Sequence, residues 1–144
     1  MRHVYVDASV LLRVVLDEPR QLLEWDDFDA PVTSCLTEVE ALRTIDRATR
    51  RVTHPRKRPL SHPAAAAARK LLYDVMETFG RIDLAPAIVT RAGQLQGPLG
   101  TLDALHLATA LAYGDHTGAR TVVATHDPEL AGAAAAHGLV VVGS

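Results

Sequence analysis

Short apolar runs alternate along this chain with longer segments whose apolar residues recur every three or four positions. The short runs predict β-strands, because most contain β-branched residues and are bounded by polar or turn residues. These strand-like runs lie at 3–7, 30–34, 81–84, 120–125 and 139–142. The longer segments predict helices, which lie at 8–16, about 19–25, 34–50, 64–80, 86–95, 101–114 and 127–138. Gly80 is expected to end the helix at 64–80.

Strands that alternate with helices predict a parallel sheet with helices on both faces. We therefore expect a three-layer α/β/α fold with a central parallel β-sheet, formed as a single domain by residues 1–144. A proline-rich, charged segment at 51–63 predicts a loop between two helices. Aromatic residues make up only 4% of the chain, so we expect a core of aliphatic side chains and alanine.

Composition and charge indicate which classes of protein this chain can belong to. The net charge is −2, so no overall field draws the chain to nucleic acid or to a membrane. The single cysteine, Cys35, excludes an internal disulfide framework and is typical of a reducing compartment. Asp7 and Arg13 interrupt the apolar N-terminal segment, and no apolar run approaches the roughly 20 residues of a membrane span. We therefore expect a cytoplasmic protein that makes no contact with the membrane.

Four acidic residues stand where predicted strands end or helices begin: Asp7, Glu40, Asp103 and Asp127. Each has an ordinary structural explanation. Asp127 precedes Pro128, which is typical of a helix N-cap, and Asp7 is placed to cap the first helix. Asp103 and Glu40 lie early in their helices, where the helix dipole or a capping box favours an acid. No single acid therefore indicates a function.

The joint placement of the acids is more informative. In a parallel α/β fold, the carboxyl ends of the strands and the helix starts that follow share one edge of the sheet, where ligands bind. All four acids fall at such positions, so we expect them to converge. Converging carboxylates repel one another unless a cation neutralises them, and oxygen ligands favour Mg²⁺, with Mn²⁺ as a substitute. The sequence thus predicts a metal site suited to phosphodiester hydrolysis.

Four motifs follow one another along the chain: VYVDASVLL, SCLTEVE, TLDALHLATAL and VATHDPELAGAAAAHGL. In this order they resemble the successive motifs of PIN-domain ribonucleases, and most closely those of the VapC toxins of bacterial VapBC toxin–antitoxin systems. The resemblance extends over nearly the whole chain, and DALHLATA is its most distinctive part.

This resemblance implies a PIN-like fold and an Mg²⁺-dependent endoribonuclease that a cognate VapB-type antitoxin inhibits. It places all four acids at the family's acidic positions, with Asp7 and Asp103 as direct metal ligands. It implies that Glu40 and Asp127 bind the metal directly or through water, complete a second metal site, or orient the attacking water. The neighbouring Glu38 does not match the family's glutamate. The resemblance also implies a homodimer and RNA products with 5′-phosphate and 3′-hydroxyl ends.

Three further polar residues lie near these acids in the sequence. Ser9 and Thr125 are each two residues from an acid, and either hydroxyl could orient a carboxylate, bind a metal-bound water or simply bond to nearby backbone. His106 lies one helical turn after Asp103, and we expect it to be packed in the core rather than to contact RNA. The chain's seven histidines show no zinc-binding spacing.

Basic residues cluster between positions 43 and 58, with seven of the chain's 15 Lys and Arg residues against one acid. Such a run suits contacts to RNA phosphates, although a charge run is also common on an ordinary solvated surface. The candidates for RNA contact are Arg47, Arg50, Arg51, Arg56, Lys57 and Arg58. The segment 17–29 has the opposite charge, with six acids, and we interpret it as solvated surface or a partner contact.

Other classes of protein account for these residues less well. A phosphatase of the haloacid dehalogenase type also begins from an aspartate after the first strand, but it requires a second aspartate where this chain has Ser9. A response-regulator receiver requires an active-site lysine, and the chain's lysines lie elsewhere. Two alternatives stay open: a non-catalytic PIN-like binding module without metal affinity, and a nuclease that acts on another nucleic acid in RNA processing or repair.

Overall fold

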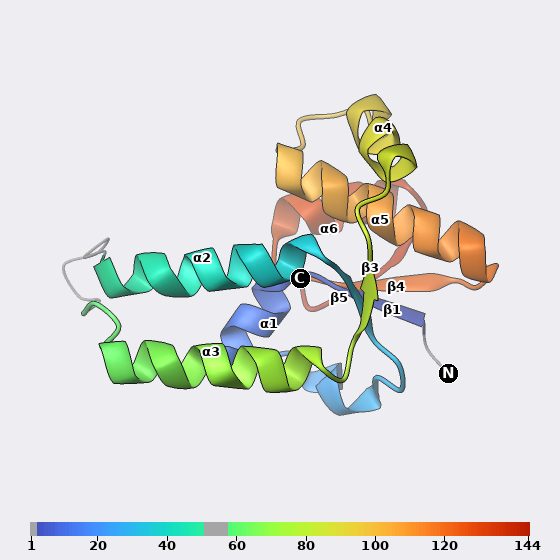
Figure 1. Ribbon diagram of the computed structural model, residues 1–144. Helices are drawn as coiled ribbons and strands as arrows, with labels where there is room; N and C mark the ends of the chain where they lie inside the picture. Colours follow the sequence, from blue (N-terminus) through green and yellow to red (C-terminus); the bar gives the residue numbers. More distant parts are fainter. Residues whose placement is uncertain (1–2, 51–57) are drawn as a thin grey trace.

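Five parallel strands form one sheet in the part of the chain that the computed structural model describes, residues 3–50 and 58–144 (Figure 1). Their order across the sheet is β3-β2-β1-β4-β5. The strands are β1 (His3–Val6), β2 (Val32–Ser34), β3 (Gly80–Ile82), β4 (Thr121–Ala124) and β5 (Val140–Val142). The parallel sheet predicted from the alternating pattern is confirmed.

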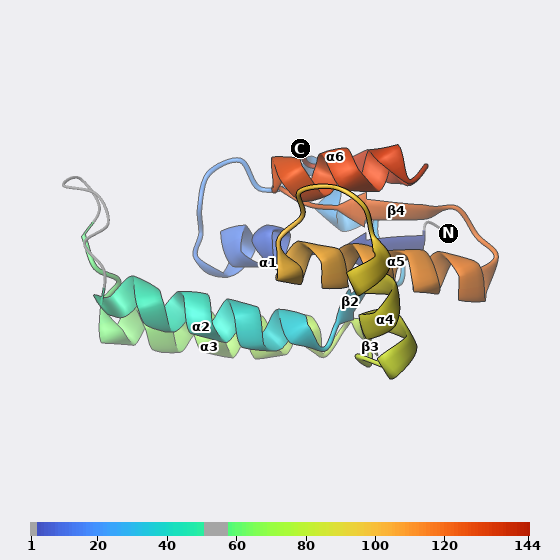
Figure 2. The ribbon, with the colours of Figure 1, turned by 90° about the horizontal axis from the view of Figure 1, so that it is seen from above.

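Helices connect the strands, as the periodicity predicts. They are α1 (Ala8–Val15), α2 (Leu36–Arg50), α3 (His62–Met76), α4 (Pro86–Gln94), α5 (Thr101–Thr117) and α6 (Pro128–Ala136), with a short 3₁₀ helix η1 (Leu23–Asp27). α2 and α3 lie side by side and extend beyond the sheet, as both views show (Figures 1 and 2). Within the described residues, no helix is long and apolar enough to cross a membrane.

The alternation of side chains along β1 shows how the sheet is covered on both faces. Val4 and Val6 pack into a buried cluster with residues of α1, α2 and α3. Tyr5, which points to the opposite face, packs with residues of α5 and α6. All three strand residues are fully buried. The predicted three-layer α/β/α architecture is therefore confirmed.

Two predicted elements differ from the structure. The helix expected at 64–80 begins at His62, because the Ser61 hydroxyl caps it by accepting from Ala64 N, and it ends at Met76. Gly80 does not end that helix but begins β3, where a Cβ atom would approach Val32 Cγ1 to 3.0 Å. Its missing side chain therefore permits strand pairing.

The second difference concerns the short helix expected at about 19–25, which is only the 3₁₀ turn η1. Asp17 and Arg20 both adopt left-handed backbone conformations, with φ of 51° and 62°. Left-handed residues interrupt a right-handed helix, so the chain before η1 is irregular. Of the predicted loop at 51–63, residues 51–57 lie outside the described part of the chain, and residues 62 and 63 belong to α3.

The strand order creates a reversal point between β1 and β4. From β1 the chain proceeds outward through β2 and β3, and it then returns to β4 on the other side of β1. Just beyond these strands, Asp7 N donates to Ala124 O at 3.0 Å and Thr125 N donates to Val142 O at 3.1 Å. In open α/β sheets, ligands bind outside the carboxyl ends of the strands at such a reversal point.

Candidate active site

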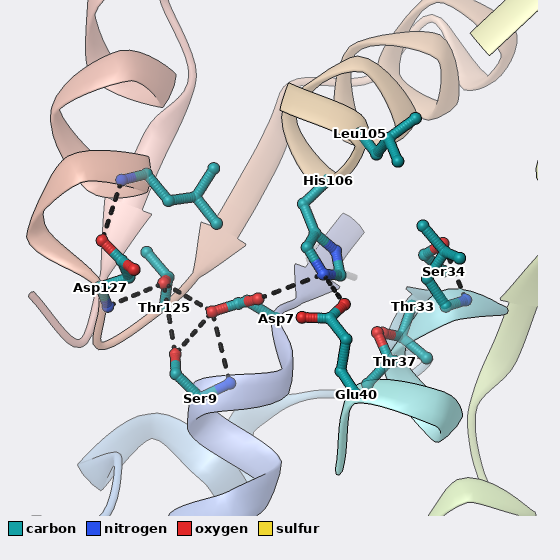
Figure 3. A network of polar contacts seen from close by, with 12 residues as sticks. Asp7, Ser9, Thr33, Ser34, Thr37, Glu40, Leu105, His106, Thr125 and Asp127 are labelled. Carbon is teal, nitrogen blue, oxygen red and sulfur yellow. Dashed lines mark hydrogen bonds and ion pairs between the residues drawn. The ribbon is translucent and has the colours of Figure 1, made fainter. Parts of the chain in front are cut away.

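Asp7 follows β1 directly and lies at this reversal point with only 5% of its surface exposed. Its Oδ2 atom accepts hydrogen bonds from Ser9 Oγ at 2.6 Å, from Ser9 N at 3.3 Å and from Thr125 Oγ1 at 3.0 Å (Figure 3). Its Oδ1 atom lies 3.6 Å from His106 Nε2. Asp7 is therefore the N-cap of α1, as its position before the first predicted helix indicates. Its other oxygen, Oδ1, faces His106 on α5.

Ser9 and Thr125 hold the Asp7 carboxylate from two elements that are distant in the sequence. Each hydroxyl donates to Asp7 Oδ2 and also accepts from a backbone N–H: Ser9 Oγ from His126 N at 2.9 Å, and Thr125 Oγ1 from Asp127 N at 3.0 Å. The two hydroxyl oxygens lie 3.4 Å apart. Thr125 therefore both orients the carboxylate and bonds to local backbone, whereas the backbone N–H that Ser9 accepts from belongs to a distant part of the chain.

Glu40 is connected to the sheet through a buried histidine. Its Oε1 atom accepts from His106 Nε2 at 2.5 Å (Figure 3). The Nδ1 atom of the same ring lies 2.5 Å from the Tyr5 hydroxyl. His106 is 1% exposed, so the expectation of a packed histidine is confirmed. The sequence did not predict its contact with Glu40. The only sequence signal for that contact is its position one helical turn after Asp103, on the face of α5 toward the sheet.

The surrounding acids raise the pKa values of the hydrogen-bonded side chains His106 and Tyr5. Burial alone lowers the pKa of His106, but the hydrogen bond to Glu40 and the negative charges of Asp7, Glu40 and Asp103 outweigh it, so the pKa is raised. Burial and the same negative region raise the pKa of Tyr5 well above its ordinary value. The acids therefore act on one another and on their neighbours as one negative cluster.

Asp103 and Asp127 complete this cluster from α5 and α6. Asp103 lies in the first turn of α5, and within the described residues its carboxylate makes no hydrogen bond or ion pair. Burial, followed by the negative charges of Asp127 and Asp7, raises the pKa of Asp103 from 3.8 to about 6. Asp127 caps α6, since its Oδ1 atom accepts from Glu129 N at 2.8 Å and from Leu130 N at 3.3 Å. The structure thus brings all four predicted acids to one region.

The donor set fits a hard divalent cation in charge and atom type. Its ligating atoms are carboxylate oxygens, which Mg²⁺ and Mn²⁺ prefer, and burial together with the negative charges of Asp127 and Asp7 raises the pKa of Asp103. In the described ranges, 3–50 and 58–144, no three acidic, histidine or cysteine side chains are close enough together to ligate one ion. As these side chains stand in the described residues, a cation would have no more than two of them as direct ligands, and water would complete its coordination.

The structure describes three of the six predicted RNA-contact residues. Arg47 lies in the last turn of α2, on the same helix as Glu40, and Arg50 is the last residue of that helix. Arg58 lies two residues before Leu60, whose N–H donates to Ala48 O near the same helix end. Arg51, Arg56 and Lys57 lie outside the described residues. Of the described candidates, only Arg47 lines a hollow that includes Glu40.

Comparison with known protein families decides the assignment of this fold. The family model of the PIN domain matches residues 4–136, which is nearly the whole of the chain. The chain belongs to the PIN domain family. The family resemblance found in the motifs is thereby confirmed. The matched range of this PIN domain includes all four acids, together with Ser9, His106 and Thr125.

Solved structures show the same fold at low sequence identity. A toxin–antitoxin complex from Klebsiella pneumoniae is similar over 86% of this chain and 86% of its own, with 16% identity and a TM-score of 0.61. VapBC2 from Rickettsia felis, bound to a DNA fragment from its promoter, matches over 96% of both chains with 10% identity and a TM-score of 0.64. VapBC-1 from nontypeable Haemophilus influenzae matches over 96% of this PIN domain and 95% of that chain, with 15% identity and a TM-score of 0.56. No curated protein matches the sequence.

Proposed function

We propose that this PIN domain is an Mg²⁺-dependent endoribonuclease, a hydrolase of RNA phosphodiester bonds that acts as the toxin of a type II toxin–antitoxin pair. The observation that carries the proposal is the convergence of Asp7, Glu40, Asp103 and Asp127 at the reversal point of the sheet. Membership of the PIN domain family supports a nuclease, and the similar VapBC structures support a toxin with a protein inhibitor.

Each acid has a role that its contacts favour. Asp7 and Asp103 would hold a divalent cation, which when bound lowers the pKa of water and offsets the charge of a phosphate. Ser9 and Thr125 fix the orientation of Asp7 through its Oδ2 atom, so Oδ1 remains available. His106 fixes Glu40, and the N-cap bonds of α6 fix Asp127. Glu40 and Asp127 bind the cation directly or through water, or orient the attacking water.

The proposed partners follow from the same function. The substrate is RNA, and the inhibitor is a cognate VapB-type antitoxin, as in the VapBC structures that this fold resembles. We also propose that the chain forms a homodimer in the cytoplasm. Analytical ultracentrifugation of the purified chain tests the dimer directly, because a sedimentation coefficient of a monomer at all concentrations contradicts it.

Cleavage of total cellular RNA by the purified protein tests the proposed function. The reaction is run with Mg²⁺, with Mn²⁺ and with EDTA, and Asp7→Asn is run in parallel to reveal contaminating nuclease. We expect discrete fragments that require metal and are absent from the variant. No fragments, together with no Mn²⁺ binding by calorimetry, would instead support the non-catalytic binding module, in which Asp7 and Asp127 serve only as helix caps.

A further inference from the structure

A hollow of about 230 Å³ lies on the surface of α2 beside the acidic cluster. Glu40 forms part of its wall, so the hollow is continuous with the candidate active site. Residues of α2 line most of it, and Leu102 from the first turn of α5 lines the side next to Asp103. A molecule that occupies this hollow therefore lies against Glu40, one of the four acids of the site.

Two apolar side chains border this α2 hollow and are left in solvent. Val39 is 58% exposed and Leu102 is 47% exposed, although both are large and apolar. They come from different helices, α2 and α5, and lie on the same hollow. Exposed apolar surface of this kind is suited to pack against a flat apolar group such as the face of a nucleobase.

Two guanidinium groups also line the hollow. Arg43 and Arg47 are four residues apart, so they lie on one face of α2. Arg43 forms an exposed ion pair with Asp46 at 3.1 Å, whereas Arg47 donates to Thr44 Oγ1 and has no carboxylate partner among the described residues. The hollow therefore combines positive charge with apolar surface at the border of a strongly negative site.

Arg50 on the same helix provides a contrast in position. Its guanidinium is bonded to Asp46, as that of Arg43 is, but Arg50 does not line the hollow. It lies ten residues beyond Glu40, which corresponds to about 15 Å along the helix axis. An RNA chain at the acidic cluster thus meets Arg43 and Arg47 well before it reaches Arg50.

We propose that the α2 hollow binds the nucleotide adjacent to the bond that is cleaved, in a single-stranded RNA. Val39 and Leu102 pack against its base, and Arg43 and Arg47 bind its phosphates. The proposal rests on the proposed function and identifies the subsite that directs RNA to the carboxylates. Positive charge at this border offsets the repulsion between the acids and a polyanion. Apolar packing and phosphate contacts favour unpaired RNA, because a base is exposed for packing only when it is unpaired.

Binding of a fluorescent eight-nucleotide single-stranded RNA tests this subsite. Every variant is made in an Asp7→Asn background with Mg²⁺ present, so the RNA stays intact and affinity is measured independently of cleavage. We expect Arg43→Ala and Arg47→Ala each to weaken binding about tenfold, which corresponds to one charge-assisted hydrogen bond. Each should also reduce the dependence of log K on log salt by about 0.7, the value for one phosphate contact to a single strand.

Matched controls separate this subsite from general electrostatic attraction. Arg50→Ala removes the same charge from the same helix, at a predicted RNA contact that lies outside the hollow, and should weaken binding by no more than about twofold. Leu102→Ala should weaken binding without changing the salt dependence, whereas Leu71→Ala removes a leucine of similar exposure from α3 and should have no effect. Thermal melting of each variant verifies that it is folded.

The outcomes distinguish failure of the subsite from failure of the proposed function. Equal losses for Arg43, Arg47 and Arg50 overturn the subsite, even if the protein with its native Asp7 cleaves RNA. Full RNA affinity in Arg43→Ala and Arg47→Ala also overturns it and leaves a protein partner as the occupant of the hollow. The expected pattern of affinities supports the subsite, even if no cleavage of this RNA is found.

Discussion

Replacement of Asp103 by asparagine should stabilise the metal-free protein at neutral pH. The Asp103 carboxylate is partly buried beside Asp127 and Asp7, and within the described residues it has no hydrogen bond or ion pair. Its ionised form is therefore less stable in the folded protein than in the unfolded chain. Asparagine has nearly the same shape and no charge, so the substitution removes the repulsion and leaves the packing in place.

The magnitude follows from the pKa of Asp103, which is raised from 3.8 to about 6. Taken at face value, that shift corresponds to about 3 kcal/mol at neutral pH. Solvent screening of the partly exposed carboxylate, and its favourable position at the positive end of α5, reduce the gain to about 1 kcal/mol. For a chain of 144 residues, this gain corresponds to an increase in Tm of about 3 °C.

The effect has a defined pH dependence. The pKa of Asp103 is higher in the folded protein than in the unfolded chain. The loss of folding stability caused by its ionisation is therefore absent below pH 3.8, grows as the pH rises and is complete above about pH 6. The variant and the wild type should therefore differ at pH 7 and converge below pH 4. Saturating Mg²⁺ should stabilise the wild type and have little effect on Asp103→Asn, because the variant has lost a ligand charge.

Thermal melting in EDTA and in Mg²⁺, at pH 7 and near pH 4, measures these differences. Asp83→Asn is the matched control, since Asp83 is exposed and such a substitution changes the unfolding free energy by less than about 0.5 kcal/mol. A Tm of Asp103→Asn below that of the wild type in EDTA at pH 7 would refute the electrostatic reasoning. Equal stabilisation of both proteins by Mg²⁺ would refute the role of Asp103 as a ligand.

Substitutions at three other residues test individual contacts of the site. Asp127→Asn keeps an acceptor for the α6 cap and should lose cleavage without loss of stability. Asp127→Ala should also lower the unfolding free energy by about 1 kcal/mol, because the cap is lost. Full cleavage by the folded Asp127→Asn protein contradicts the role of this acid. His106→Ala should lower the unfolding free energy in urea by about 1–3 kcal/mol, because it leaves Glu40 without its buried partner, and an unchanged midpoint argues against that network. Thr125→Val removes a donor to Asp7 and should weaken Mn²⁺ binding about tenfold by calorimetry, whereas unchanged affinity shows that Ser9 orients the carboxylate alone.

The layers of the fold could be predicted from the sequence because side-chain periodicity determines which face of an element is buried. Val4, Tyr5 and Val6 alternate between two cores in the structure, as a strand buried on both faces requires. Gly80 was assigned wrongly because a glycine after a helix is usually its C-cap. Here the missing side chain of Gly80 leaves room for Val32, which lies on a neighbouring strand that is distant in the sequence.

The candidate site could be predicted from the sequence only in part. The positions of the four acids followed from the rule that strand ends and helix starts share one edge of a parallel sheet. The hydrogen-bonded contacts of His106 with Tyr5 and Glu40 did not follow, since they join β1, α2 and α5 across the core. A lone histidine on a helix carries no sequence signal for such partners. The hollow beside Glu40 likewise depends on how α2 and α5 meet.

The chemistry of the RNA ends tests the proposed hydrolysis by a metal-activated water most directly. Fragments produced with Mg²⁺ are sequenced after ligation reactions that accept either 5′-phosphate or 5′-hydroxyl ends, with Asp7→Asn as the control. Water attack predicts 5′-phosphate and 3′-hydroxyl ends that appear only with metal and disappear in the variant. Fragments with 5′-hydroxyl and 2′,3′-cyclic phosphate ends, formed equally in EDTA, would show attack by the ribose 2′-hydroxyl and contradict a metal-dependent nuclease at these four acids.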